Sequence, residues 1–444
     1  MNVIILNGAQ ADDQTGEQVR AALLEALHTR GWQVEEFVLR EQKIGACAGD
    51  FFCWIRNPGV CNVNDDNRLI AEAMVDKDVI IYLTPITFGG YNSTLKRMVD
   101  HQIQNISPNF ATINGETHHH KRYSSYPDFL SIGWLEAADA PAEQVFHYLA
   151  QRNGLNFHAN KVISGVVLAG HSVSQLQSAV EGWLDDLMDG RPLKMQGLLP
   201  APEQIITVDP AAALETMDIR RALLLVGSPK TRKSTSNALG EYLFEQLQTQ
   251  SITTETIYLH TVVRSPKKMA ALLEAVEAAD LIVLAHPLYV DSLPAPVIEV
   301  LELIAAQRQN QEQPRRQLFA AIANCGFPEA HHNVPALAMC ALFAHQAGFI
   351  WAGSLALGGG QGIVNGISLS ELDGRVNHIK AALDLAAAAL AQGRAIPAEA
   401  QNLVARPVIP AWLYRLMGGF GWRMQARQYG AQKQLKRRPY AEQR

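Results

Sequence analysis

Short apolar runs alternate with segments of helical periodicity along the whole chain, and this alternation occurs twice. The predicted strands lie at 3–6, 34–39, 79–83 and 162–168 in the first half, and near 222–226, 254–259, 281–285, 317–323 and 349–357 in the second. Segments such as 17–27 and 269–279 carry apolar residues at helical spacing between them. Strands that alternate with helices indicate a parallel sheet covered on both faces. We therefore predict an α/β protein of two tandem, doubly wound domains.

The number of strands and the position of the loops favour one strand order. Five strands per half, with candidate binding loops after the first and third, favour a flavodoxin-like order over the longer Rossmann arrangement. No Gly-x-Gly-x-x-Gly follows either first strand, and the glycine run 358–362 follows a fifth strand instead. Five-stranded parallel sheets are thus expected in both halves.

Irregular segments set the expected boundaries. Residues 107–160 lack a clear period, so we interpret them as an insertion, and a short strand near 205–208 would complete the first sheet. The Pro-rich stretch 200–210 is the expected seam. The predicted parts are a domain over 1–210, a domain over 219–395 and a basic, aromatic tail over 396–444.

Composition agrees with two domains and narrows the class of protein. A chain of 444 residues with 48% apolar residues should form more than one core. The net charge of -5 gives no overall attraction to nucleic acid. The chain opens on a core strand without a processing pattern, and no apolar run approaches the roughly 20 residues that span a bilayer. Five cysteines argue against a secreted disulfide framework, so a cytoplasmic location is expected.

The loop after the first strand of the second half has the chemistry of a phosphate site. It reads Gly-Ser-Pro-Lys-Thr-Arg-Lys-Ser-Thr-Ser-Asn over 227–237. Backbone amides at a helix start, hydroxyl donors and nearby cations together attract a dianionic phosphate. A solvated basic turn is the alternative interpretation. The candidate phosphate ligands are Ser228, Lys230, Ser234, Thr235 and Ser236.

These residues resemble the flavodoxin-like flavin reductases known as the NADPH-dependent FMN reductase family, and the resemblance covers both halves. It implies FMN as cofactor and NAD(P)H as electron donor. The loops after the third and fourth strands resemble the family's ring-binding segments, which implies ring contacts by Pro287, Leu288, Tyr289, Val290, Asp291, Asn324, Cys325, Gly326 and Phe327. A degenerate domain kept for its fold is the alternative for the second half.

The first half departs from the family pattern in its first loop. Residues 7–15 carry Asp12 and Asp13 and no cation, and carboxylates beside a phosphate repel it by about 1 kcal/mol each. Flavin binding by the first domain is therefore doubtful. Its second loop still resembles the ring-binding segment, so we rank a second set of candidates below the first: Thr84, Pro85, Thr87, Phe88 and Gly89.

Cys47, Cys53 and Cys61, followed by Asp65 and Asp66, resemble a segment of iron–sulfur flavoproteins and their cluster-free relatives. Asp50 stands here at the position of the second cysteine in that segment. Three thiolates and a carboxylate make a poor four-iron site, so no cluster is expected and the cysteines are interpreted as packing or dimer-contact residues. Adjacent histidines at 118–120 would point in different directions on an extended loop, so no metal site is expected either.

The tail beyond 405 interleaves aromatic residues with arginines, a composition typical of membrane-surface or single-stranded nucleic-acid binding. Gly418, Gly419 and Gly421 are expected to interrupt an amphipathic helix. We therefore expect a packed tail that crosses a domain or subunit seam, with peripheral membrane contact as the alternative and no nucleic-acid partner.

The expected function is FMN-dependent transfer of electrons from NAD(P)H to a small-molecule electron acceptor, such as a quinone, a nitro compound or a flavin. Catalytic side chains are unknown from the sequence, because the cofactor carries the chemistry. A flavodoxin-like electron carrier and a non-catalytic binding or assembly module are the alternatives. Family members commonly dimerise, so a homo-oligomer stays open, as does pairing of the tandem domains within one chain.

Overall fold

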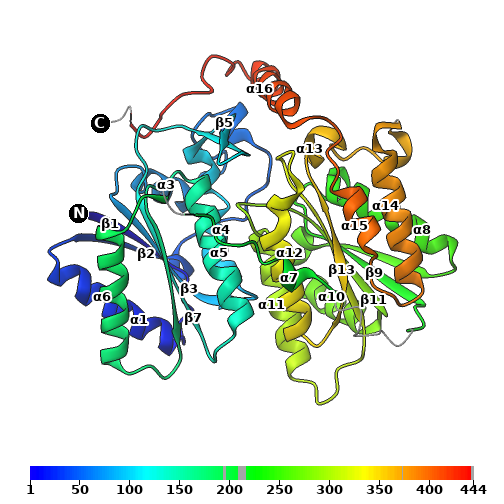
Figure 1. Cartoon of the computed structure of the whole chain (residues 1–444), viewed down its shortest axis with the longest axis horizontal. Helices are drawn as coiled ribbons and strands as arrows, with labels where there is room; N and C mark the ends of the chain where they lie inside the picture. The colour runs from blue at the N-terminus through cyan, green and yellow to red at the C-terminus, as the bar shows by residue number, and fades with distance from the viewer. Residues whose placement is uncertain (194–196, 209–216, 373, 442–444) are drawn as a thin grey trace. The chain divides into compact units, whose positions relative to one another are not determined.

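The computed structural model describes residues 1–193, 197–208, 217–372 and 374–441. The chain forms two compact units, each built around one parallel sheet (Figure 1). Unit 1 comprises Met1–Ala201 and Leu416–Arg444, and unit 2 comprises Pro202–Arg415. Position 209 and position 210 of the expected seam lie outside the described residues.

The sheet of unit 1 has the flavodoxin-like strand order. Its parallel strands run β2-β1-β3-β7-β8, and their bounds are β1 (Asn2–Asn7), β2 (Gln33–Val38), β3 (Val79–Thr87), β7 (Asp128–Leu135) and β8 (Val162–Leu168). A short strand, β4 (Gly90–Tyr91), folds back onto β3 in an antiparallel hairpin. This order confirms the predicted fold class and places the ends of β1 and β3 side by side.

Two expectations for the first half were wrong. The insertion is shorter than 107–160, because only the hairpin of β5 (Ile106–Ile113) and β6 (Glu116–Lys121) leaves the sheet, while β7 and α5 (Ala140–Asn156) belong to the core of the fold. Ser131 and Gly133 interrupt the apolar pattern of β7, so the sequence did not predict this strand. A Cβ on Gly133 would lie 2.6 Å from Ile86, so the position requires a residue without a side chain. The strand expected at 205–208 is instead a helical turn, α7 (Glu203–Ile206), in unit 2.

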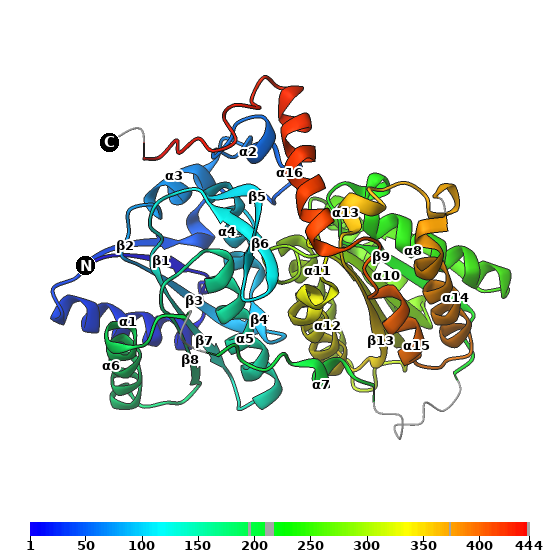
Figure 2. The ribbon, with the colours of Figure 1, turned by 45° about the horizontal axis from the view of Figure 1, so that its top comes forward.

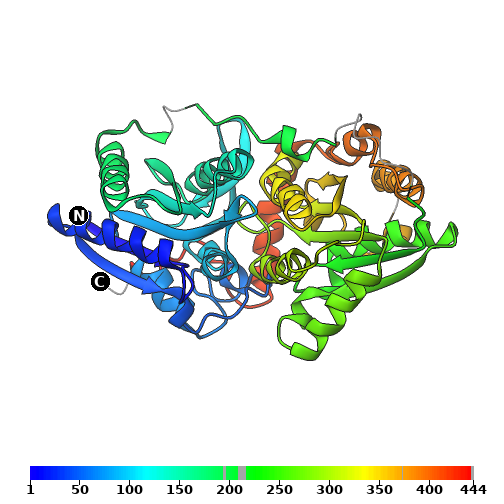
Figure 3. The same cartoon turned by 90° about the horizontal axis from the view of Figure 1, so that it is seen from below.

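Helices cover both faces of the first sheet. The apolar stripes of α1 (Gln14–Thr29) and α6 (Val173–Asp189) pack on one face, where they form a core with β1 and β3. Figure 1 shows these two helices side by side. The other helices of this unit include α3 (Asp66–Ala73), α4 (Ser93–Val99) and α5. Figure 3 shows the sheet between its helix layers.

Unit 2 repeats the arrangement, with all five strands close to the positions that the sequence predicts. The order is β10-β9-β11-β12-β13, with bounds β9 (Arg221–Val226), β10 (Thr253–Tyr258), β11 (Leu281–Pro287), β12 (Leu318–Asn324) and β13 (Ile350–Leu357). The core on one face is formed with α8 (Thr235–Thr249), α14 (Asn377–Ala391) and α15 (Ala398–Val404). The remaining long helices are α10 (Pro266–Ala278), α11 (Ala295–Gln309) and α12 (Val334–Gln346). Among the described residues, no helix has the length and apolar character needed to cross a membrane.

The stretch 396–444 is not one separate tail. Its first part belongs to unit 2, since Ala400 and Val404 of α15 are buried in that core. Residues from Leu416 onward belong to unit 1. The helix α16 (Ala411–Arg427) is continuous through the three glycines, contrary to expectation. Gly418 lies so close to Phe110 of β5 that a Cβ would come within 2.3 Å of its ring, and Figure 2 shows α16 beside this hairpin.

Candidate functional site

The first loop of unit 2 ends in a helix start that carries no negative charge. Ser234 is the N-cap of α8: its Oγ accepts a hydrogen bond from the Asn237 amide at 3.1 Å and donates one to the Thr231 carbonyl at 2.6 Å. The amides of Thr235 and Ser236, in the first turn, have no helical acceptor by the geometry of a helix start. The positive end of α8 is therefore able to receive an anion.

Cations surround this helix start. Lys230, Arg232 and Lys233 are exposed, whereas Ser228 is buried and its Oγ accepts a hydrogen bond from the Lys230 amide at 3.3 Å. The loop 227–237 contains no acidic residue. Side-chain charge and helix dipole thus have the same sign here, and both favour a dianion.

The second loop of unit 2 forms a tight hairpin with a strained backbone. The backbones of Tyr289 and Ser292 exchange hydrogen bonds of 3.0 and 3.1 Å. The two residues between them, Val290 and Asp291, have φ angles of 46° and 57°. Positive φ at both central positions is the type I′ geometry, which normally takes Asn or Gly, and a β-branched residue there costs about 1–2 kcal/mol. Strain of this kind is typical of ligand-binding loops.

One buried amide joins the three candidate loops. The Asn324 Nδ2 donates to Ser236 Oγ at 2.9 Å and to the His286 carbonyl at 3.0 Å, and the Asn324 carbonyl accepts from the Leu288 amide at 2.8 Å. The first-loop helix, the end of β11 and the end of β12 are therefore fixed to one another. The structure brings the predicted residues of all three loops to the same edge of the sheet.

Two elements beside this edge were missed by the sequence reasoning. The loop after β13 enters α13 (Gly360–Ile363), and its Gly360 carbonyl accepts from Thr235 Oγ1 at 3.2 Å. Tyr414 Oη donates to the Gly326 carbonyl at 2.9 Å. A Cβ on Gly362 would lie 2.8 Å from Tyr414 Oη. The glycine run 358–362 was the available signal: it permits close approach to the loops rather than dinucleotide binding.

Titratable groups at this edge are held neutral by burial. Desolvation lowers the pKa of His286 to about 4, and it raises the pKa of the Cys325 thiol to about 12. His286 is fully buried, with its Nδ1 3.2 Å from the Pro287 carbonyl and its Nε2 3.8 Å from Cys340 Sγ. These groups fit structural roles better than proton transfer at neutral pH.

The corresponding helix start of unit 1 supplies its own anion. Asp13 is the N-cap of α1, with Oδ1 accepting from the Gly16 amide at 2.8 Å and Oδ2 accepting from Trp134 Nε1 at 2.9 Å. Asn7 lies at the end of β1, and its Nδ2 donates a hydrogen bond to Glu36 Oε1 at 2.9 Å. A carboxylate thus stands where a phosphate would need the helix dipole, and it is fixed by a second hydrogen bond.

The second loop of unit 1 repeats the hairpin of unit 2. Phe88 and Gly89 have φ angles of 52° and 79° between the paired residues Thr87 and Gly90. Thr84 is fully buried, and its Oγ1 donates to the Pro85 carbonyl at 2.9 Å. The second-ranked candidates therefore lie in a hairpin that resembles the second loop of unit 2.

The neighbouring contacts in unit 1 close this edge from within. Asn92 Nδ2 donates to the Gly8 carbonyl at 2.7 Å, and its Oδ1 accepts from the Leu95 amide at 3.0 Å. A Cβ on Gly8 would lie 2.8 Å from that of Leu95. Lys96 and Asp100 form a fully buried ion pair in the following helix turn. These internal contacts can maintain the fold of unit 1 without a ligand at this edge.

The three cysteines of unit 1 lie in a desolvated environment. Burial raises the pKa of the Cys47 thiol to about 12 and raises that of Cys53 well above its usual value. Cys53 belongs to an apolar cluster with Trp54 and Trp422, and Cys61 Sγ lies 3.6 Å from His101 Nδ1.

The same segment uses its carboxylate locally. Asp50 Oδ1 accepts from the Phe52 amide at 3.0 Å at the start of α2 (Phe52–Ile55). The two remaining cysteines of the chain, Cys325 and Cys340, lie in unit 2. This segment thus supplies three thiols, of which Cys53 is buried and Cys47 and Cys61 are half-buried, together with a carboxylate that forms a turn.

The histidines at 118–120 are divided by the alternation of β6. The ring of His118 is fully buried between Glu116, at 2.8 Å, and Asn156, at 2.9 Å. His119 points the other way and lies 4.6 Å from the Trp54 ring, centroid to centroid. Arg152 also pairs with Glu116. His118 is thus part of a buried ion network within unit 1.

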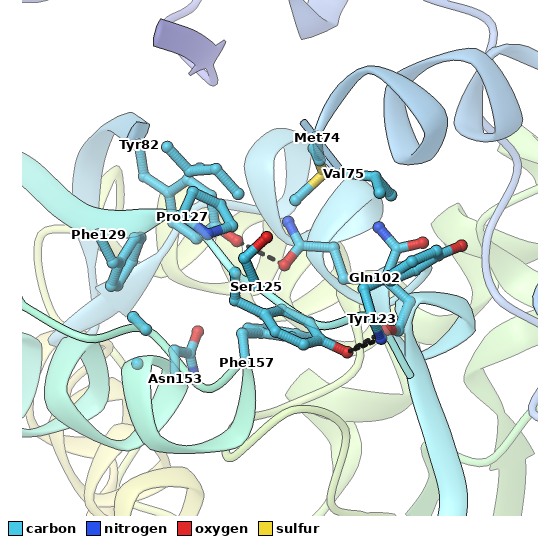
Figure 4. A pocket seen from close by; sticks show the side chains of 15 residues that line it. Met74, Val75, Tyr82, Gln102, Tyr123, Ser125, Pro127, Phe129, Asn153 and Phe157 are labelled. Carbon is cyan, nitrogen blue, oxygen red and sulfur yellow. Dashed lines mark hydrogen bonds between the residues drawn. The ribbon is translucent and has the colours of Figure 1, made fainter. Parts of the chain in front are cut away.

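A small pocket in unit 1 lies away from the carboxyl ends of the strands (Figure 4). Aromatic rings line it, among them Tyr82, Phe129 and Phe157. Tyr82 Oη donates to Gln102 Oε1 at 2.7 Å, while Gln102 Nε2 and Asn105 Oδ1 are buried without a hydrogen-bond partner among the described residues. The cavity volume is about 30 Å³. That volume suits one or two water molecules, not a flavin.

Comparison with known proteins finds the same family in both halves. The family model described as NADPH-dependent FMN reductase matches residues 1–118 and 220–361, which together exceed half of the chain. The iron–sulfur flavoprotein of Methanosarcina thermophila is 27% identical over 114 residues, covering 26% of this chain and 59% of that protein. A second one, from Methanocaldococcus jannaschii, is 32% identical over 101 residues, covering 22% and 51%. The chain therefore spans little more than half the length of these curated relatives.

Solved structures with a similar fold are distant in sequence. A structure from Klebsiella pneumoniae, titled a putative quinone reductase, has a TM-score of 0.35 and 12% identity, and it covers 49% of this chain and 97% of its own. The NAD(P)H:quinone oxidoreductase of Methanothermobacter marburgensis has a TM-score of 0.32 and 12% identity, with coverage of 41% and 98%.

Proposed function

Since this chain belongs to the NADPH-dependent FMN reductase family, we propose that unit 2 binds FMN and acts as an NAD(P)H-dependent flavin oxidoreductase. The observation that carries this proposal is the neutral-capped, cation-ringed start of α8 at the edge where three loops are joined by Asn324. The activity of the whole protein is part of the proposal, because the chain spans little more than half of its curated relatives.

The phosphate end of the cofactor would bind at the first loop. The first-turn amides of Thr235 and Ser236 would provide donors, and Ser228, which lies in the same loop, would add a hydroxyl. Lys230 adds a positive charge near the turn. Donors already positioned by a helix need no rearrangement when the anion arrives, so little binding free energy is lost to ordering.

The ring end would bind between the second and third loops. The hairpin at 289–292 and the turn at 325–327 supply backbone groups, while Tyr289 and Phe327 are the aromatic residues beside them. The paired hydrogen bonds between Tyr289 and Ser292 hold the strained residues Val290 and Asp291 in one conformation, which favours a preorganised edge for a flat ring.

When bound, FMN would accept hydride from NAD(P)H and deliver electrons to a small acceptor, such as a quinone or a nitro compound. The side chains of this unit contribute binding and orientation rather than proton transfer. His286 is neutral at physiological pH because burial lowers its pKa, and its carbonyl holds Asn324 in place.

Unit 1 is proposed to keep the fold without the cofactor. Asp13 occupies the helix start that a phosphate would need, and Trp134 fixes that carboxylate. We expect one FMN per chain, bound by unit 2, and no iron–sulfur cluster.

The test is titration of purified, cofactor-stripped protein with FMN, followed by addition of NADPH or NADH under anaerobic conditions. Flavin fluorescence gives affinity and stoichiometry, and loss of absorbance near 450 nm reports reduction. The double variant Ser228→Asp/Thr235→Asp places two carboxylates at the phosphate turn and should abolish FMN binding. Gln14→Asp, at the first helical position of α1, is the matched control in unit 1 and should leave binding unchanged.

Three outcomes would contradict parts of this proposal. Two FMN molecules per chain would assign a flavin to unit 1 as well. Unchanged binding in the double variant would remove the site from unit 2. FMN binding without reduction by either nicotinamide would favour an electron carrier that receives electrons from a partner protein.

A further inference from the structure

An exposed apolar stripe runs along α16. Trp412, Leu416, Phe420 and Met424 recur every four residues, and they are 64%, 67%, 65% and 56% exposed. Met417, between them, is 56% exposed. Large apolar side chains in a contiguous exposed stripe normally mark a surface that contacts another apolar phase or a partner.

The opposite side of the same helix is fixed to unit 1. Trp422 packs edge-on against Phe51 and Trp54, with ring centroids 5.4 and 5.3 Å apart, and Ala426 is fully buried. Gly418 allows the helix to approach Phe110 of β5. The helix therefore has one anchored side, and packing holds the apolar stripe on the solvent side.

The surroundings of the stripe are strongly basic. Arg423 and Arg427 are exposed and lie at helical spacing on the same side as Phe420 and Met424. The segment 411–441 contains no acidic residue. The coil after the helix adds four further exposed cations: Lys433, Lys436, Arg437 and Arg438.

The basic coil is also held in place. Arg122 donates to the Leu435 carbonyl at 3.3 Å and to the Arg437 carbonyl at 2.7 Å. Tyr440 Oη donates to Gln104 Oε1 at 3.2 Å. The cations are therefore presented by an ordered segment of unit 1 that continues directly from α16.

We propose that α16 and the basic coil dock this protein on the surface of an anionic phospholipid bilayer. The apolar stripe would enter the boundary between headgroups and acyl chains, with a tryptophan among its residues, while Arg423 and Arg427 reach lipid phosphates. Charge decides between this occupant and a second copy of the chain: pairing two such surfaces would bring the same cations together without an acid to offset them. This inference does not depend on the proposed flavin chemistry.

The experiment is co-sedimentation of the full chain, loaded with FMN where it binds, with vesicles of phosphatidylcholine alone or mixed with phosphatidylglycerol. Binding should require the anionic lipid and weaken as salt is raised. Emission from Trp412 should shift to shorter wavelength on binding, and Trp412→Phe should remove that shift. The variant Arg423→Gln/Arg427→Gln should bind about thirtyfold more weakly, because each of the two cations contributes a factor of about five to six to the affinity for an anionic surface.

The stripe variant Leu416→Ser/Phe420→Ser/Met424→Ser should lose at least about a hundredfold in vesicle affinity. Val173→Ser is the matched control, because Val173 is 64% exposed on α6 of the same unit, and it should bind as the wild type does. Unchanged circular dichroism verifies the fold of each variant. Absence of wild-type binding to anionic vesicles would overturn the proposal. So would full binding by the stripe variant, or a loss of self-association in that variant while vesicle binding persists.

Discussion

Removal of the Asn324 side chain should separate the stability of unit 2 from its proposed cofactor site. Asn324→Ala deletes the hydrogen bonds to Ser236 Oγ and to the His286 carbonyl, at 2.9 and 3.0 Å, and leaves that buried carbonyl without its donor. Two lost bonds at about 0.5–1.5 kcal/mol each, with about 1 kcal/mol or more for the unsatisfied group, give a loss of about 2–4 kcal/mol. The three loops lose their common tie, so FMN affinity should fall at least about tenfold.

The matched control is Asn92→Ala in unit 1. Asn92 also donates to a loop carbonyl, that of Gly8 at 2.7 Å, and accepts from the Leu95 amide at 3.0 Å. Its loss should therefore destabilise unit 1 by a similar amount and leave FMN affinity unchanged. Urea unfolding gives the free energies, and flavin fluorescence below the unfolding transition gives the affinities. FMN affinity that is equal in wild type and Asn324→Ala, or equally reduced in Asn92→Ala, would refute the reasoning.

Three further predictions follow from the two helix starts and from the buried titratable groups. Ser234→Asp should weaken FMN binding by at least about thirtyfold through repulsion of the phosphate, whereas Asp13→Ser should not change it; both are measured by fluorescence titration. The pKa of His286 is about 4 when folded and about 6.5 when unfolded, so the unfolded chain binds the extra proton. The free energy of unfolding of unit 2 should thus fall as pH falls from 6.5 to 4, by about 3 kcal/mol, and His286→Gln should flatten that slope in urea melts. Iodoacetamide at pH 8 should alkylate Cys47 and Cys53 slowly in the folded chain and rapidly after denaturation, because burial raises both thiol pKa values; peptide mass mapping measures this, and fast native labelling would contradict it.

Three strands of unit 2, β9, β11 and β12, could be predicted closely because each is mainly an apolar run. The strand β7 could not, since Ser131 and Gly133 interrupt its pattern and their reason lies elsewhere in the fold. Gly133 is required by the approach of Ile86 from the neighbouring strand. A pattern along one segment carries no information about such a partner.

The clustering of the site residues could also be predicted, because parallel strands bring their carboxyl ends to one edge. The joining role of Asn324 and the cover provided by Tyr414 could not. Tyr414 meets Gly326 from 88 positions along the chain, and only the tertiary structure brings them together. The continuity of α16 was missed for a related reason, since Gly418 is favoured by close packing on Phe110 despite its low helix propensity.

The Asp13 carboxylate that caps α1 has a consequence for how the stability of the protein depends on its cofactor. If unit 1 holds no flavin, as we propose, its stability would not depend on the FMN concentration in the cell. Unit 2, in which a neutral serine caps α8, would become more stable as the free FMN concentration rises. One polypeptide would then join a unit whose stability is independent of the FMN supply to a unit whose lifetime depends on it.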